Sequence, residues 1–170
     1  MLLFWLNALR RKYPTLPSTS LETTDFTSKT NVLKFPKPKL KKSKIEKIFD
    51  FTVIEWNNDQ KIILSKIHKQ FKKGKIIIRS SAMGEDSIEK SSAGIYESVL
   101  NVKVNEEKNI IKAITSVIKS YNENGNYDQN NQILIQSQTQ NIKTSGVVFT
   151  KTPDLAAPYF VINYEEGSAT

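Results

Sequence analysis

The spacing of apolar residues changes several times along the chain, and each change predicts a new element. Ile63, Ile67 and Phe71 recur every fourth residue, which predicts a helix that begins at Asn58 or Asp59 and ends before Gly74. A second helix is expected after a cap at residue 105, with an apolar stripe at residues 110, 111, 114, 117, 118 and 121. A shorter helix is expected to start at residue 27 or 28.

Runs rich in β-branched and aromatic residues lie between these helical patterns. They predict strands over residues 49–56, 75–79, 94–102, 133–138, 145–150 and 159–164. The polar stretch 122–132 has no apolar period and is expected to be a surface loop. Strands interleaved with two long helices indicate an α+β domain, with flanking helices on a mixed and largely antiparallel sheet.

The first 24 residues differ from the rest of the chain. Residues 2–6 form a short apolar run, and residues 13–24 are rich in proline, serine and threonine. The apolar run is too short to span a membrane, and its basic residues follow it rather than precede it, unlike those of a signal peptide. We therefore expect an extension or linker over residues 1–24 and one domain over residues 25–170.

Composition narrows the possible chemistry. The chain has no cysteine and one histidine, which excludes thiolate catalysis and cysteine-rich zinc sites and disfavours a histidine-based metal site. The absence of cysteine also suits a reducing compartment, so a cytoplasmic location is expected. The formal net charge of +8 favours polyanionic partners.

Much of this charge lies in one segment, where seven lysines and two prolines fall between residues 34 and 47. Such a run is usually a solvated surface loop, and that is the first interpretation. Binding to nucleic acid is the alternative, although Phe35 is the only aromatic residue among the lysines before residue 47.

The segment IIIRSSAMGEDSIEKSSAG, residues 76–94, is the strongest candidate for chemistry. An apolar strand ends at Arg79, whose guanidinium stays protonated and offers a rigid fork of donors to phosphate oxygens. The serines and the backbone amides near the glycines can add neutral donors around a polyphosphate. From composition alone, a surface loop whose arginine pairs with a carboxylate is the first interpretation, because the chain has neither a Walker motif nor a GxGxxG pattern.

The order of residues adds a family resemblance. RSSAMGEDSIEKSSAGIYESVLNV, from Arg79, resembles the signature of the nucleotide-binding domain that phosphoenolpyruvate synthases, pyruvate phosphate dikinases and rifampicin phosphotransferases share. ILIQSQTQNIKTSGVVFTKTP, residues 133–153, resembles a later pair of strands in that family. TSKTNVLKF, residues 27–35, is similar to the segment in which a lysine opens a helix and reaches the nucleotide.

The resemblance implies an ATP-grasp fold, here a partial one, and a role for several residues. Arg79 would contact the phosphates, and Lys29 would assist, with Lys34 as the alternative lysine. The loop from Ser80 to Gly94 would close over the triphosphate. The implied nucleotide contacts within or after that loop are Ser80, Ser81, Ser92, Gly94 and Ser98. Gln136 would lie at an interlobe hinge and meet the adenine edge.

ATP and Mg²⁺ are the implied cofactors. The Mg²⁺ ligands, the phosphohistidine domain and the acceptor domain of such enzymes would lie beyond residue 170, so this chain alone is not expected to hold a complete active site. The implied function is an ATP-binding module of a dikinase-type phosphotransferase, which converts ATP to AMP and passes a phosphoryl group to a carrier histidine. A non-catalytic form of the module, with structural or regulatory contacts, and a basic nucleic-acid-binding protein are the alternatives.

Overall fold

The computed structural model describes residues 28–34, 43–82 and 95–167. These residues belong to two compact units, one that ends at Gln138 and one that starts at Thr139. The predicted boundary at residue 24 and the predicted contacts Ser92 and Gly94 lie outside the described residues. None of the helices in the described ranges is long and apolar enough to span a membrane.

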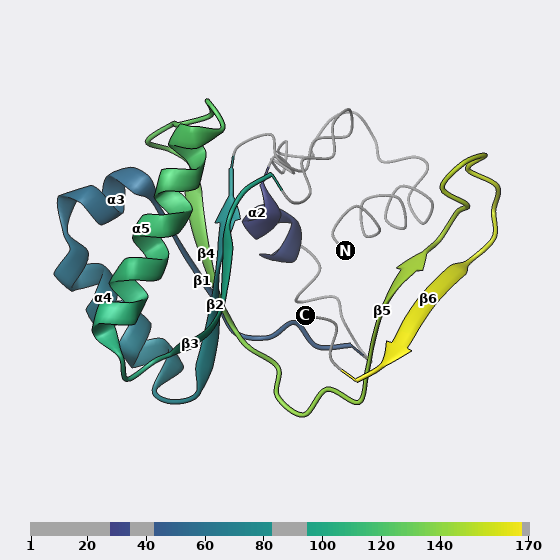
Figure 1. The fold of residues 1–170 in the computed structure, drawn as a ribbon, viewed down its shortest axis with the longest axis horizontal. Coiled ribbons are helices and arrows are strands. Elements are labelled where there is room, and N and C mark those ends of the chain that lie inside the picture. The colour runs from purple at the N-terminus through teal and green to yellow at the C-terminus, as the bar shows by residue number, and fades with distance from the viewer. Residues whose placement is uncertain (1–27, 35–42, 83–94, 168–170) are drawn as a thin grey trace, which may run out of the picture. The chain divides into compact units, whose positions relative to one another are not determined.

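The first unit contains a four-stranded antiparallel sheet with the order β1-β4-β2-β3 (Figure 1). Its strands are β1 (Ile48–Thr52), β4 (Gln132–Ser137), β2 (Lys75–Ser81) and β3 (Ser98–Lys103). β2 and β4 are the central strands, and their alternate isoleucines are almost fully buried. Together with its flanking helices, the sheet confirms the predicted α+β class and agrees with a partial ATP-grasp-like domain.

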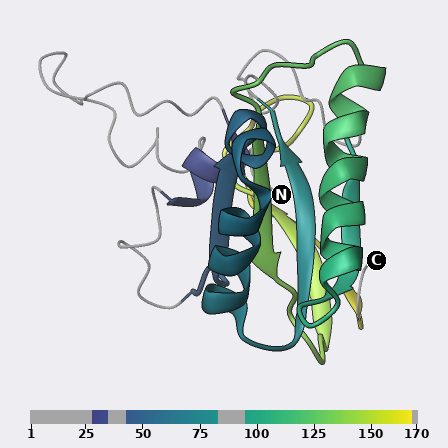
Figure 2. The ribbon, with the colours of Figure 1, turned by 90° about the vertical axis from the view of Figure 1, so that its left-hand side faces the viewer.

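Two long helices cover one face of this sheet, α4 (Gln60–Phe71) and α5 (Glu107–Glu123), and Figure 2 views the molecule from their side. The apolar stripes of both helices belong to one buried core with the isoleucines of β2 and β4. The short helix α2 (Lys29–Lys34) lies on the opposite face of the sheet (Figure 1). A shorter helix, α3 (Val53–Asn58), joins β1 to α4.

The predicted strand over residues 49–56 is wrong in its second half. β1 ends at Thr52, and α3 begins at the next residue. The Thr52 hydroxyl accepts a hydrogen bond from the Glu55 amide at 3.3 Å, while the Glu55 carboxylate accepts one from the Thr52 amide at 2.7 Å. This reciprocal capping box satisfies two backbone donors and starts a helix in spite of the β-branched sequence.

Other boundaries also differ from the prediction. The predicted strand over residues 94–102 begins only at Ser98, after a turn at residues 95–96. The cap of α5 is Glu106 rather than Asn105, and its side chain makes no capping hydrogen bond. It instead accepts hydrogen bonds from the Lys103 ammonium, at 2.8 Å, and from the Asn109 amide.

The second unit is a β-hairpin of β5 (Thr144–Phe149) and β6 (Val161–Glu166). Gly146 faces Tyr164 across the two strands. A Cβ at Gly146 would lie 2.4 Å from the Asn163 carbonyl oxygen, so a glycine is required where these two backbones meet. Val148, Ile162 and Tyr164 share a face with Gly146 and are exposed.

Candidate functional site

Four side chains form a row across the sheet face on which α2 lies. Asp50, Leu134, Arg79 and Ser98 are direct partners on β1, β4, β2 and β3 in turn. Directly opposed residues in an antiparallel sheet project to the same face. The side chains of Ile76 and Ile78 point to one face of β2 and belong to the core under α4 and α5. Arg79 follows Ile78 directly, so its guanidinium projects to the other face.

Arg79 is half-buried and lies on a central strand. Among residues 28–34, 43–82 and 95–167, no carboxylate forms an ion pair with it. Asp50, in the same row, is two strands away, which corresponds to about 10 Å. The Asp50 carboxylate is instead 2.7 Å from the Lys34 ammonium. The alternative interpretation, in which Arg79 forms a structural ion pair, therefore has no support in the described part of the chain.

Helix α2 is fixed on this face by buried and partly buried hydrogen bonds. The Ser81 hydroxyl, at the end of β2, accepts hydrogen bonds from the Thr30 amide at 3.1 Å and the Thr30 hydroxyl at 3.0 Å. The Ser28 hydroxyl donates to the Gln132 side-chain oxygen on β4 at 2.8 Å. These contacts bring Lys29, between Ser28 and Thr30, to the sheet face that carries Arg79.

Lys34, the alternative lysine, is at the other end of α2. Its ion pair with Asp50 holds this end of the helix on β1. The Lys34 side chain is 50% exposed and that of Asp50 is 17% exposed. The contact favours a structural role for Lys34, and the choice of Lys29 as the ligand contact stays a prediction.

Tyr121 is a positioning residue that the sequence analysis missed, because it counted only as part of the apolar stripe of α5. The Tyr121 hydroxyl accepts a hydrogen bond from the Ser81 amide at 2.9 Å and donates one to the Gln132 carbonyl at 2.6 Å. The Tyr121 hydroxyl therefore joins the last residue of β2 to the first residue of β4, beneath the docked α2. Tyrosine on a buried apolar stripe was the available sign, since a buried hydroxyl needs hydrogen-bond partners.

The remaining predicted residues occupy different places. Ser98 is exposed and lies directly opposite Arg79. Ser80 is buried and alternates with Arg79, so its side chain lies on the face covered by α5. Ser81 uses its hydroxyl to dock α2. The structure therefore brings Lys29, Arg79 and Ser98 to one face and leaves Ser80 on the other.

Gln136 is half-buried on β4 and opposes Ile77 on β2 and Ile48 on β1. Gln136 shares a face with Leu134, and therefore with the direct partner of Leu134, Arg79. Arg79 lies two residues after Ile77 on β2. The first unit ends at Gln138, two residues after it. Gln136 thus lies near the end of this unit, and its role as a hinge residue stays a prediction.

The described residues hold no cluster of three or more histidine, aspartate or glutamate side chains that could ligate a metal ion. The Asp50 carboxylate is engaged by Lys34.

Comparison with protein families gives the context of this face. The family model of the pyruvate phosphate dikinase AMP/ATP-binding domain matches residues 55–163, more than half of the chain. The chain belongs to this family. The matched range of this dikinase-family domain includes Arg79, Ser98 and Gln136 but not Lys29.

The predicted family membership is therefore confirmed, and nucleotide binding is the property that the family name carries. No curated protein and no solved structure matched the chain. The roles assigned to individual residues of this dikinase-family domain remain predictions.

Proposed function

We propose that this chain binds ATP on the sheet face that carries Arg79, as the nucleotide module of a dikinase-type phosphotransferase. The observation that carries the proposal is a half-buried arginine on a central strand with no carboxylate partner in the described ranges. A guanidinium desolvated in this way needs an anion, and the phosphates of a nucleotide supply one.

Each neighbouring residue has a role in this proposal. The guanidinium of Arg79 forms a two-pronged contact with phosphate oxygens, and the Ser98 hydroxyl directly opposite adds a neutral donor. The ammonium of Lys29, on the helix that the Ser28 and Thr30 contacts fix to this face, neutralises a second phosphate. The Gln136 amide reads the polar edge of adenine with a donor and an acceptor.

Phosphoryl transfer depends mainly on positioning and charge neutralisation, which are what these residues can provide. We propose that the full reaction converts ATP to AMP and passes a phosphoryl group to a histidine on another domain. Mg²⁺, when bound with the nucleotide, would neutralise charge on the phosphates. Its ligands and the final acceptor follow from the family resemblance alone.

Titration calorimetry with ATP tests the site. Arg79→Ala is expected to weaken ATP binding by about 1.5–3 kcal/mol, the range for a hydrogen bond to a charged group. Lys108→Ala, which removes an exposed cation from α5, is the matched control and is expected to bind ATP like the wild type. Urea unfolding of each variant establishes that it is folded. Equal affinity of the wild type and a folded Arg79→Ala variant would contradict the proposal.

A further inference from the structure

The first unit also contains a cavity of about 630 Å³. It opens where β1 and β2 begin and β4 ends, and it does not include Arg79. Its lining consists of Ser43–Lys47 before β1, Phe71–Lys73 at the end of α4, and Ser137. We refer to it as the lysine cavity. Its volume lies within the range of ordinary small-molecule sites, about 300–1,000 Å³.

Hydrogen bonds hold the walls of the lysine cavity in place. The Gln70 side-chain amide donates to the Ile48 carbonyl at 2.7 Å and ties the end of α4 to β1. The Ser137 amide donates to the Lys47 carbonyl at 2.9 Å, which continues the pairing of β4 with the segment before β1. The lining residues therefore come from three parts of the chain that are fixed to one another.

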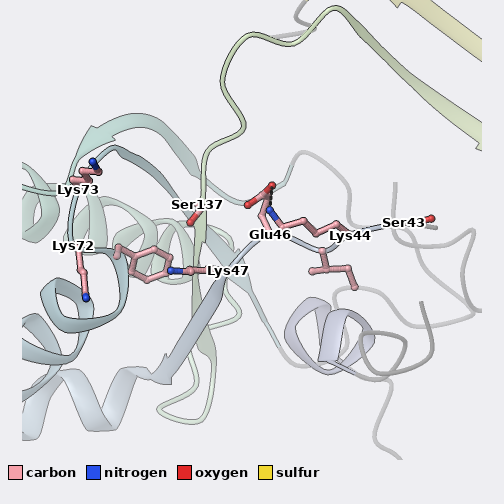
Figure 3. A pocket seen from close by; sticks show the side chains of 9 residues that line it. Ser43, Lys44, Glu46, Lys47, Lys72, Lys73 and Ser137 are labelled. Atoms are coloured by element: carbon pink, nitrogen blue, oxygen red, sulfur yellow. Dashed lines mark hydrogen bonds and ion pairs between the residues drawn. The ribbon is translucent and has the colours of Figure 1, made fainter. Parts of the chain in front are cut away.

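The charge on this lining is strongly positive. Four lysines and one carboxylate line the cavity, and Glu46 is 3.3 Å from Lys44 on the outer segment. Lys47, Lys72 and Lys73 form no ion pair with any carboxylate of the described residues. In Figure 3, Lys72 and Lys73 stand on the α4 side, Lys44 and Glu46 on the other, and Lys47 and Ser137 between them. Like charges around a concave surface focus a positive potential that an anion relieves.

The chemistry of the lining limits the kind of anion. Lysine ammonium groups are flexible point charges that can converge on phosphate oxygens, and the Ser137 hydroxyl adds a neutral partner. Phe71, the aromatic residue of the lining, is only 4% exposed, so it offers no face on which a nucleobase could stack. The lining therefore suits phosphate groups rather than nucleobases.

The lysine cavity is distinct from the Arg79 face. Ser137 follows Gln136 on β4, and successive residues of a strand project to opposite faces. Ser137 opposes Ile76 on β2. Arg79 lies three residues after Ile76 on the same strand and opposes Leu134. We infer that the lysine cavity, through Lys47, Lys72, Lys73 and Ser137, binds a small oligophosphate with two or more phosphate groups.

Tripolyphosphate is a suitable probe, and calorimetry in an Arg79→Ala background removes the principal contact of the proposed nucleotide face. The background protein is expected to bind about one tripolyphosphate per chain. Adding Lys47→Gln and Lys72→Gly is expected to weaken that binding about tenfold or more, because two ammonium contacts are lost. Lys72 has φ of 33°, a value that side-chain-bearing residues rarely adopt, so glycine at this position is not expected to disturb the fold.

Lys61→Gln with Lys66→Gln, on exposed positions of α4, is the matched control, since it removes the same net charge outside the lysine cavity. The control is expected to bind like the background protein. Amide resonances of Lys73 and Ser137 should shift with tripolyphosphate in the background protein, a readout that needs no cavity variant.

Three outcomes would overturn the inference. They are the absence of saturable binding, equal weakening in the cavity and control variants, and tighter binding of an oligonucleotide through the same lysines. Because every protein in this experiment carries Arg79→Ala, a failure here leaves the ATP proposal untouched, and a failure of the ATP proposal leaves the lysine cavity untouched.

Discussion

The Ser81 side chain accepts two hydrogen bonds from Thr30, and the Ser81 backbone amide donates to the Tyr121 hydroxyl. Ser81 thereby connects α2 on one face of the sheet with α5 on the other. Its hydroxyl is 0% exposed along with the rest of the residue. Ser81, for which the family resemblance implied a nucleotide contact, thus anchors the helix that carries Lys29.

This anchor can be tested with Ser81→Ala. The substitution leaves two Thr30 donors without an acceptor in a buried position, which is expected to lower the free energy of unfolding by about 1–3 kcal/mol. ATP affinity is expected to fall as well, because Lys29 loses its fixed position. Urea unfolding and calorimetry measure the two effects. Ser65→Ala, on an exposed position of α4, should change neither, and an unchanged stability in Ser81→Ala would contradict the anchor.

The two ends of α2 are expected to respond differently to loss of their lysines. Lys29→Ala should weaken ATP binding about tenfold, the equivalent of one charge-assisted hydrogen bond. Lys34→Ala should mainly remove the ion pair with Asp50, an effect of at most about 1 kcal/mol on unfolding for a partly exposed pair. Calorimetry on both variants compares them, and a larger loss of ATP affinity from Lys34→Ala would reverse the assignment.

The sequence predicted those helices and strands in which the spacing of apolar side chains follows one buried surface. The fourfold spacing of Ile63, Ile67 and Phe71 gave α4, and the apolar run before Arg79 gave β2, because each pattern reflects one buried surface. The sequence predicts one strand where the structure has β1 followed by α3, because β-branched and aromatic residues lie on both sides of the boundary at Thr52. The Thr52–Glu55 capping box decides that boundary through two hydrogen bonds that a count of apolar residues does not register.

The candidate site was predictable in part for a similar reason. Motif order pointed to Arg79 and Ser98, and strand pairing placed them opposite each other. Partners far apart in sequence were not predictable. Ser81 meets Thr30 across 51 residues and Tyr121 across 40. Asn131, in the stretch predicted to be a surface loop, is fully buried, and its carbonyl accepts a hydrogen bond from the Val53 amide.

Gly146 offers a test of the second unit. Gly146→Ala places a Cβ against the Asn163 carbonyl oxygen, so the two strands must separate, at a cost of about 1–3 kcal/mol. Amide hydrogen exchange should show loss of protection in β5 and β6 and unchanged protection in β2 and β4. Thr144→Ala, at an exposed position of the same strand, is the control. Unchanged protection of β5 in Gly146→Ala would contradict the close approach.

Acid titration tests the contact between Lys103 and Glu106. The hydrogen bond from the Lys103 ammonium, followed by that from Asn109, holds the pKa of Glu106 below its usual value of 4.5. A lowered pKa in the folded state means that the contribution to stability is present above pH 4.5 and is lost as the pH falls through the folded-state pKa. The stability difference between wild type and Lys103→Met should therefore vanish in acid.

The titration can be followed by NMR at the Glu106 carboxyl. Its pKa should lie below 4.5 in the wild type and rise in Lys103→Met. Lys108→Met removes a neighbouring exposed cation and serves as the control, with the pKa of Glu106 expected to stay low. The same pKa of Glu106 in the wild type and Lys103→Met would show that the contact does not form in solution.

The most direct measurement of the nucleotide face is NMR of the arginine side chains and backbone amides during an ATP titration. The chain has three arginines, at residues 10, 11 and 79, so the Arg79 guanidinium resonance can be identified by one substitution, Arg79→Ala. ATP is expected to shift the Arg79 guanidinium and the amides of Ser98 and Gln136, while adenosine leaves the guanidinium unshifted. Shifts confined to α4 and α5, with the Arg79 guanidinium unchanged at saturation, would contradict ATP binding at this face.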